Sequence, residues 1–208
     1  SNIRKMNKLA KILERKRARR GAVQFSFAEE FFEFDTNQHI IGVGRSYQSS
    51  AMKIIEQFML EANETVAQHC VKNRILSIYR SHDRPDMKKL TKLQKTFHRY
   101  GIKTPTKALS DPKKFNEILE QIQDFPFFEQ LQTLLLRSMA LAVYSTNNKG
   151  HFGLAAKYYT HFTSPIRRYP DLLVHRALKE KIYIDQGLKR KRSIFINGGV
   201  AELCSQLE

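Results

Sequence analysis

The chain has 208 residues, 41% of them hydrophobic, which is enough apolar material for one folded domain and argues against disorder. Lysine and arginine number 36 against 20 acidic residues, a net charge of +16 that predicts a polyanionic partner. No stretch approaches the roughly 20 apolar residues that span a bilayer, so we expect no membrane partner. Cys70 and Cys204 lack metal-ligand spacing, which favours a reducing, cytoplasmic setting.

The first half of the chain alternates helical and strand-like patterns. Residues 3–20 read as a basic helix that ends at Gly21, and its charged face is either solvated or in contact with RNA. Strand-like runs follow at 23–27, 31–34 and 39–43, with a hairpin turn between the last two. A long helix is predicted from 50 to 73, with an apolar stripe formed by Ile55, Met59, Ala62, Val66 and Cys70.

The second half is predicted to be mostly helical. A buried strand at 75–80 precedes three helices at 87–100, 111–123 and 127–144. Residues 150–163 read as strand and loop, followed by a helix over 165–183, a basic linker at about 186–193 and a last helix that is capped by Asn197 and continues to Glu208. This order predicts an α+β fold, with long helices packed around a short mixed or antiparallel sheet.

The segment SPIRRYPD at 164–171 carries the strongest chemical signal. Ser164 suits a helix cap and Pro165 a first helical residue, which would put Arg167 and Arg168 in the first turn. Cations are unfavourable at this end of the helix dipole unless an anion lies among them. Because N–H groups at a helix start bind phosphate, we expect a phosphate site here; alternatively, Arg167 pairs with Asp171.

Further candidate RNA contacts surround this segment. Four aromatic side chains, which either stack on bases or alternate into the core, come just before the arginines: Tyr158, Tyr159, His161 and Phe162. The hydroxyls of Thr163 and Ser164 are able to donate to phosphate oxygens. Asn63 falls beside the apolar stripe of its helix and therefore needs a partner, either an internal one or RNA. Arg80 is a candidate phosphate ligand.

Several unusual segments together resemble a known family. HFTSPIRRYPDL at 161–172 resembles the signature of the RNB-domain 3′→5′ exoribonucleases, the family of ribonuclease R and ribonuclease II, and its RRYPD form is closer to ribonuclease R. The same family order is matched by FMLEAN at 58–63, RSHDRP at 80–85, LLRSMALAVY at 135–144 and GHFGLA at 150–155. The resemblance covers the chain from about Ala18 onwards.

The resemblance implies a processive, magnesium-dependent, monomeric enzyme that degrades single-stranded RNA to nucleoside 5′-monophosphates. Arg167 matches the arginine that approaches the scissile phosphate, Glu56 a glutamate near the ribose, and Phe25 an aromatic that clamps the last bases, although a strand phenylalanine is by default a core residue. The expected RNA-binding set is Phe25, Glu56, Asn63, Arg80, Tyr159, His161, Thr163, Ser164 and Arg168.

The aspartates of the chain do not form the closely spaced cluster that holds magnesium in this family. We therefore expect residues 1–208 to be the C-terminal part of an RNB catalytic domain. The magnesium ligands, the cold-shock-type domains and the C-terminal OB-fold would lie outside it. Two functions stay open: a part of the RNA channel of an exoribonuclease, inactive by itself, or an RNA-binding module that lacks catalysis.

Overall fold

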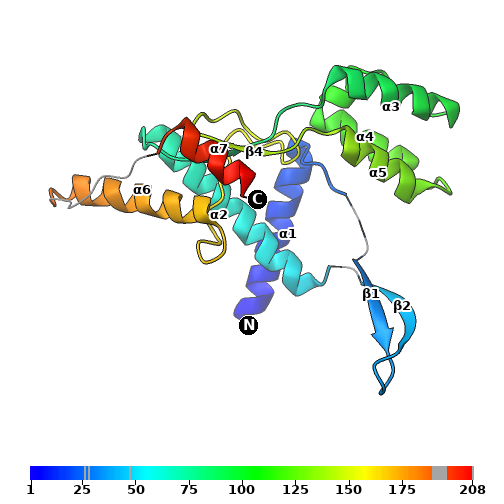
Figure 1. Ribbon diagram of the computed structural model, residues 1–208, viewed down its shortest axis with the longest axis horizontal. Coiled ribbons are helices and arrows are strands. Elements are labelled where there is room, and N and C mark those ends of the chain that lie inside the picture. Colours follow the sequence, from blue (N-terminus) through cyan, green and yellow to red (C-terminus); the bar gives the residue numbers. More distant parts are fainter. Residues whose placement is uncertain (26, 28, 47, 189–195, 208) are drawn as a thin grey trace.

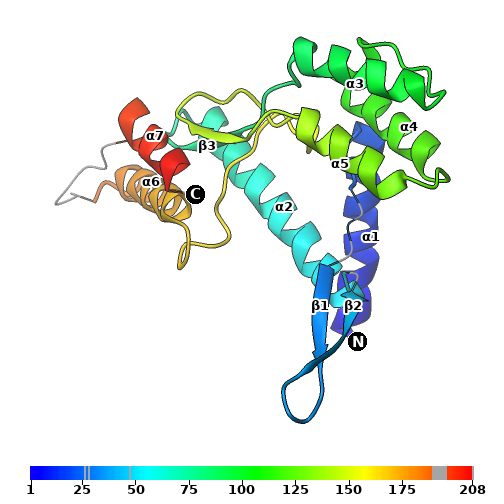
Figure 2. The same ribbon diagram turned by 45° about the vertical axis from the view of Figure 1, so that its right-hand side comes forward.

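The structure, a computed structural model, describes residues 1–208 apart from 26, 28, 47, 189–195 and 208. Long helices dominate this part of the chain, together with two antiparallel sheets of two strands each. The predicted α+β class is confirmed, although the strands form two separate pairs instead of one sheet. Helices α3, α4 and α5 gather at one end and α6 and α7 at the other, with α2 between them (Figure 1, Figure 2).

Two long helices, α1 (Asn2–Arg20) and α2 (Ser50–Lys72), pack against each other. Gly21 ends α1 with φ 101°, as predicted, because a glycine adopts this left-handed conformation without strain. Two hydrogen-bonded ion pairs connect the helices, Arg20 with both carboxylate oxygens of Glu64 at 2.7 Å and Lys16 with Glu61 at 3.0 Å, and Arg17 approaches Glu61 at 4.0 Å. These pairs fix which face of α2 is turned towards α1.

The apolar stripe predicted for α2 is wrong at Ile55 and Met59 and confirmed at Cys70, while Ala62 and Val66 are partly buried. Ile55 is 56% exposed and Met59 38% exposed, whereas the buried residues are Ile54, Gln57, Asn63, Ala67 and Cys70. The buried face thus includes two polar side chains, which an assignment by hydrophobic periodicity does not place inside. Of these two, Asn63 contacts the segment that leads to the arginines, and Gln57 lines a cleft between α1 and α2.

Strands β1 (Glu29–Phe34) and β2 (Ile40–Ser46) form the predicted hairpin, which projects away from the helices in both views (Figure 1, Figure 2). The carboxylate of Asp35 closes the turn by accepting from the backbone N–H groups of Asn37 and His39, each at 2.8 Å. The strand predicted at 23–27 is wrong for the residues of that range that the structure describes. Val23 instead donates its N–H to the carbonyl of Gly153 at 2.7 Å.

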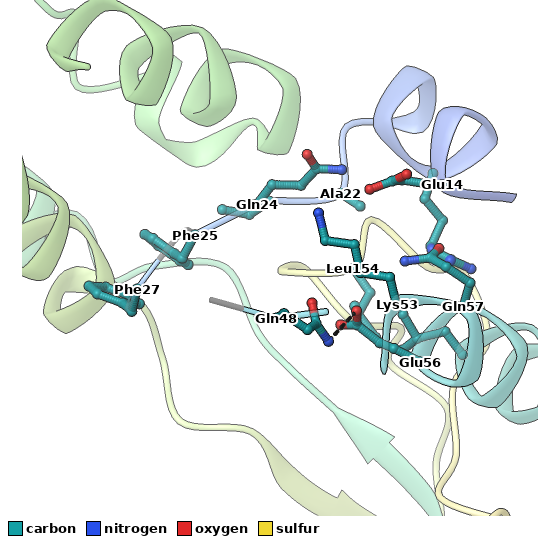
Figure 3. A pocket seen from close by; sticks show the side chains of 13 residues that line it. Glu14, Ala22, Gln24, Phe25, Phe27, Gln48, Lys53, Glu56, Gln57 and Leu154 are labelled. Atoms are coloured by element: carbon teal, nitrogen blue, oxygen red, sulfur yellow. Dashed lines mark hydrogen bonds between the residues drawn. The ribbon is translucent and has the colours of Figure 1, made fainter. Parts of the chain in front are cut away.

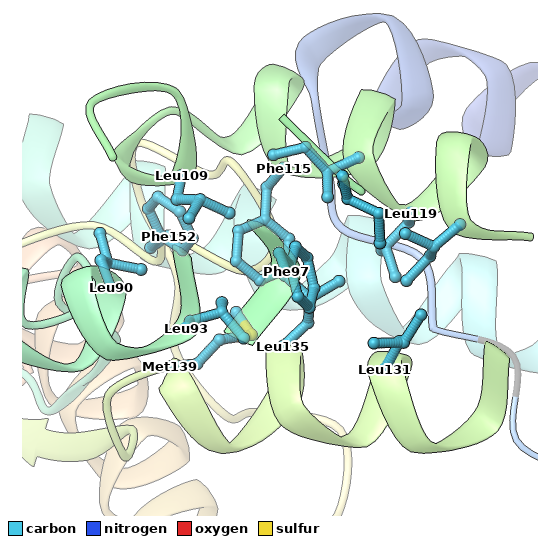
Figure 4. Packing of buried hydrophobic residues seen from close by; sticks show 13 residues of the cluster. Leu90, Leu93, Phe97, Leu109, Phe115, Leu119, Leu131, Leu135, Met139 and Phe152 are labelled. Atoms are coloured by element: carbon cyan, nitrogen blue, oxygen red, sulfur yellow. The ribbon is translucent and has the colours of Figure 1, made fainter. Parts of the chain in front are cut away.

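Helices α3 (Met87–Arg99), α4 (Pro112–Ile122) and α5 (Phe128–Ser138), with a short 3₁₀ turn at Ala108–Ser110, enclose an apolar core around Phe97, Phe115 and Leu135 (Figure 4). The structure corrects the end of the third helix, predicted at residue 144. The chain leaves the helix earlier because Val143–Ser145 forms β4, which pairs with β3 (Tyr79–Ser81). This pairing overrides local helix propensity.

The C-terminal part holds α6 (Tyr169–Asp185) and α7 (Gly198–Gln206). Asn197 caps α7 as predicted, by accepting from the N–H of Val200 at 2.9 Å, but the helix ends at Gln206 instead of continuing. Most of the predicted basic linker at 186–193 lies outside the described residues. Within the described ranges, no helix combines the length and apolar character needed to cross a bilayer.

Candidate nucleic-acid interface

The two arginines lie just before a helix and not in its first turn. Residues 165–167 form a turn, α6 begins at Tyr169, and Arg168 occupies the cap position, so the predicted capping by Ser164 is wrong. The physical reason is Pro170, which has no N–H for the carbonyl four residues earlier and is therefore tolerated only in the first turn of a helix. The proline after the arginines thus sets the start of α6.

Asp171 holds this turn in place. Its side chain is fully buried, and its Oδ1 accepts from the backbone N–H of Ser164 at 2.7 Å and from Nη2 of Arg168 at 2.8 Å. An acidic side chain in the first turn also suits the helix dipole. The alternative pairing considered from the sequence, Arg167 with Asp171, is replaced by Arg168 with Asp171.

Arg167 is therefore the cation that the turn presents. Its side chain is exposed, and within the described part of the chain no carboxylate forms an ion pair with it. Its backbone N–H donates to the carbonyl of Ser164 at 3.3 Å, which fixes the base of the side chain. Four residues earlier, the buried hydroxyl oxygen of Thr163 has no hydrogen-bond partner among the described residues. The turn thus presents the guanidinium of Arg167 to an anion.

Asn63 fixes the strand-like segment that leads to the turn. Its Oδ1 accepts from the N–H of Phe162 at 3.0 Å, and its Nδ2 donates to the hydroxyl of Tyr159 at 3.2 Å. Both side chains are about 95% buried or more, and burial raises the pKa of Tyr159. Because both ends of the Asn63 amide are used internally, this residue positions residues 159–162.

His161 lies between this segment and the small sheet. Its Nδ1 is 2.7 Å from the hydroxyl of Tyr144 on β4, and the guanidinium of Arg80 on β3 stacks over the Tyr144 ring with its carbon 4.6 Å from the ring centre. Burial first, and then the positive charges of Arg168 and Arg80, lower the pKa of His161 to about 4. The imidazole is therefore neutral near pH 7, and the positive charge that the turn presents comes from Arg167.

His82 in the RSHDRP segment makes two structural hydrogen bonds. Its Nε2 donates to the carbonyl of Ala140 at 2.8 Å, and its Nδ1 accepts from the N–H of Gly153 at 3.1 Å. Burial lowers its pKa, which keeps the ring neutral and this pattern intact. His82 thus joins β3 to the loop that precedes the arginines.

Phe25 and Glu56 lie apart from the arginine turn, in a cleft of about 460 Å³ between residues 22–25 and 27, α1 and α2 (Figure 3). Phe25 stacks on Phe27 with ring centres 5.8 Å apart and also packs against the apolar core. Glu56 accepts a hydrogen bond from Nε2 of Gln48 at 3.1 Å. Glu56 and Asn63 are seven residues apart on α2, or roughly 10 Å along its axis. α2 therefore connects the cleft to the arginine turn.

The structure brings most of the predicted RNA-binding residues into one neighbourhood. The set around the arginine turn consists of Asn63, Arg80, Tyr159, His161, Thr163, Ser164, Arg167 and Arg168. The sequence pattern did not indicate that Tyr144 contacts His161, and the ion pair considered for Asp171 was with Arg167 instead of Arg168. The signal that was present is Pro170 followed by an acid, because a proline in the first turn places that acid at the helix start.

A metal site is not found in the part of the chain that the structure describes. No group of three or more His, Cys, Asp or Glu side chains there is arranged to hold an ion. Magnesium prefers several oxygen ligands around an octahedral centre, and Asp171, the one fully buried aspartate of the arginine turn, is used by Ser164 and Arg168. The described residues therefore do not fit the metal that the sequence resemblance implies.

Comparison with known proteins gives this arrangement a family. The RNB domain matches residues 1–183. The chain belongs to the RNB family. Ribonuclease R of Escherichia coli (strain K12) is 38% identical over 186 residues, which cover 89% of this chain and 23% of the relative. Mycoplasma genitalium RNase R in complex with ribose methylated single-stranded RNA has a TM-score of 0.80 at 30% identity, covering 98% of this chain and 32% of that one.

The RNB chain described here thus spans about a quarter of the length of the curated relative that it matches. A more distant likeness is to yeast Ssd1, described as a pseudonuclease, with a TM-score of 0.60 at 24% identity over 77% of this chain and 19% of that one. This likeness shows the fold alone. The RNB fold by itself therefore does not decide whether a chain cuts RNA.

Proposed function

We propose that this chain forms part of the RNA channel of a 3′→5′ exoribonuclease, and that the parent protein processively hydrolyses single-stranded RNA to nucleoside 5′-monophosphates. The observation that carries the proposal is the exposed guanidinium of Arg167, which stands without an ion-pair partner among the described residues on a turn fixed by the buried carboxylate of Asp171. Family membership and the identity to ribonuclease R support it.

Arg167 is the proposed catalytic residue. A planar guanidinium offers two parallel N–H donors to phosphate oxygens, which an ammonium does not match. Its role is to stabilise the charge that develops on the phosphoryl group as the phosphodiester is cleaved. Because the turn is held by Asp171 and Arg168, the backbone that carries Arg167 is fixed before RNA arrives, which reduces the ordering free energy lost on binding.

The other predicted residues divide into two kinds in this proposal. Arg168, Asn63 and Tyr159 are buried or internally paired, so they position the turn and its approach. Thr163, Ser164, Arg80 and His161 line that approach and contact the phosphate backbone. In the separate cleft, Phe25 stacks on a base near the 3′ end, and Glu56 accepts from a ribose 2′-hydroxyl, which favours RNA over DNA.

Magnesium is proposed as the metal of the parent protein, with its ligands outside this chain. The described residues contain no suitable donor cluster, so no step is assigned to a metal here. We also propose that the parent is monomeric and cytoplasmic; the free cysteines Cys70 and Cys204 support the location.

A second candidate is an RNA-binding module without catalysis. The lack of a metal-binding cluster among the described residues favours it. Both candidates bind RNA through the same turn, so binding alone does not separate them.

Mononucleotide release separates the two functions. The chain is purified alone and joined to the sequence that precedes Ser1 in its gene, and each protein receives magnesium and a 3′-tailed RNA. We expect no release from the chain alone and release from the joined protein. A joined protein that binds RNA and stays inert supports the module, and release by the chain alone contradicts the proposed location of the metal ligands.

A further inference from the structure

The cleft that contains Phe25 and Glu56 also contains two buried polar side chains, Arg17 on α1 and Gln57 on α2 (Figure 3). Arg17 is 4% exposed and Gln57 7% exposed. Neither was singled out by the sequence pattern. Both line the cleft, and Gln57 lies across it from the stacked rings of Phe25 and Phe27 (Figure 3).

These two side chains have unused hydrogen-bonding atoms. Among the described residues, Nη1 and Nη2 of Arg17 and Oε1 of Gln57 make no hydrogen bond. The carboxylate of Glu61 comes only to 4.0 Å from Nη1, beyond hydrogen-bond distance. Leaving buried donors and acceptors without partners destabilises a fold, so their presence together calls for an explanation.

A purely structural explanation is that Arg17 ties α1 to α2. Those helices are already joined by hydrogen-bonded ion pairs, Arg20 with Glu64 and Lys16 with Glu61. Glu64 and Glu61 are hydrogen-bonded to other cations, although their charges act against the burial that lowers the pKa of Arg17. Apart from the 4.0 Å ion pair with Glu61, Nη1 and Nη2 of Arg17 therefore have no partner among the described residues.

We propose that Arg17 and Gln57 hydrogen-bond the edge of a nucleobase that stacks on Phe25, an assignment that rests on the proposed RNA-binding function. The guanidinium provides donors for a carbonyl oxygen or ring nitrogen, and the Gln57 oxygen accepts from an amino or imino group beside it. A base edge combines these two kinds of group. The cleft volume of about 460 Å³ lies in the usual range for small-ligand pockets.

A base fits this end of the cleft better than a phosphate does. The carboxylates of Glu14 and Glu56 line the cleft together with the cations Arg17 and Lys53, so the lining has no excess positive charge to offset a phosphate. A neutral heterocycle needs no such charge and uses the aromatic wall. The phosphate groups of the same strand are left to the arginine turn.

The test combines a protein substitution with removal of the base. Binding of this chain to a single-stranded RNA is compared with binding to RNAs in which one abasic residue is moved stepwise from the 3′ end. Removal of the base that occupies the cleft weakens binding to the unsubstituted chain. We expect that weakening to be about fivefold smaller for Gln57→Leu, because in this variant the hydrogen bond between Gln57 and the base is already absent.

Two further variants complete the experiment. Gln68→Leu makes the same change at an exposed position of α2 outside the cleft and is expected to keep the full base dependence. Arg17→Lys keeps the charge but loses the fork of donors, and its base dependence is expected to shrink as in Gln57→Leu. Urea unfolding confirms that each variant is folded; Gln57→Leu removes an unpartnered buried oxygen and is expected to be at least as stable as the unsubstituted chain.

The outcomes separate this assignment from the proposed function. RNA binding with an unchanged base dependence in Gln57→Leu overturns the nucleobase site and leaves the proposed function standing. If the unsubstituted chain binds no RNA, the proposed function fails and the assignment fails with it. A smaller base dependence in Gln57→Leu and Arg17→Lys, but not in Gln68→Leu, supports it.

Discussion

Arg168 and Asp171 form an ion pair of 2.8 Å in which the carboxylate is fully buried and also accepts from the N–H of Ser164. This pair gives two adjacent arginines opposite roles. Arg168 turns inward and stabilises the turn, and Arg167 turns outward to solvent. The positive charge offered to RNA at this point is therefore a single guanidinium with a fixed backbone.

Replacing Asp171 by alanine tests whether its ion pair with Arg168 stabilises the turn. The change leaves the partly buried guanidinium of Arg168 without its partner and the N–H of Ser164 without an acceptor, so the free energy of unfolding should fall by about 3–5 kcal/mol. Urea denaturation measures it. Asp185→Ala, at an exposed pair with Lys181, should cost less than about 1 kcal/mol. If Asp171→Ala and Asp185→Ala lower the free energy of unfolding equally, the buried ion pair stabilises the fold no more than the exposed one does.

Arg167→Lys tests the proposed catalytic role of Arg167. The substitution is made in the protein that joins this chain to the sequence preceding Ser1. The lysine keeps the charge but loses bidentate contact with the phosphoryl oxygens, so turnover should fall about 10²-fold while the Kd for RNA changes only severalfold. Single-turnover kinetics and equilibrium binding measure the two quantities. Arg176→Lys, exposed on α6, is the matched control. Equal losses in turnover and binding would reduce Arg167 to a binding residue.

Hydrophobic period and helix-end signals were enough to find most helices. The boundaries at Gly21, Asp111 and Asn197 follow from local chemistry, namely a left-handed glycine and two side-chain caps. The start of α6 was misplaced because two prolines, Pro165 and Pro170, each suit a first turn. Only the second is compatible with the helix that follows, since an interior proline breaks the hydrogen-bond ladder.

The candidate site was harder to predict because its polar residues are buried. Asn63 and Gln57 lie on the inner face of α2, while Ile55 and Met59 lie outside. A hydrophobic stripe assigns inside and outside by polarity, so it fails where polar side chains serve a site. The tertiary partners of these residues, such as Tyr159 for Asn63, come from distant parts of the chain and leave no local signal.

Asn63→Leu tests the positioning role. The variant leaves the N–H of Phe162 and the hydroxyl of Tyr159 without their buried partner, so the free energy of unfolding should fall by about 1–3 kcal/mol. RNA binding should weaken as well, because residues 159–162 lead into the arginine turn. Chemical denaturation and RNA titration are measured on the same preparation. An Asn63→Leu variant with unchanged stability and RNA affinity would contradict a positioning role for Asn63.

The buried, neutral imidazole of His161 should make the free energy of unfolding fall at acid pH. Its folded pKa of about 4 lies below the ordinary value of 6.5, so as the pH falls the unfolded chain takes up a proton first. The stability contribution is present above pH 6.5 and is lost between about pH 6.5 and 4. The dependence of the unfolding free energy on pH reports how many more protons the unfolded chain binds than the folded one. In His161→Gln this number should fall by about one between pH 6.5 and 4. The matched control, His98→Gln at an exposed position, should leave it unchanged. An unchanged number in His161→Gln would contradict a neutral, buried His161.

The salt dependence of RNA binding tests most directly whether Arg167 meets a phosphate. For single-stranded RNA, each phosphate contact contributes about 0.7 to the slope of log affinity against log salt concentration. We predict that Arg167→Gln lowers the slope by about this amount and that Arg176→Gln on exposed α6 leaves it unchanged. The same slope for Arg167→Gln and the unsubstituted chain would contradict the account.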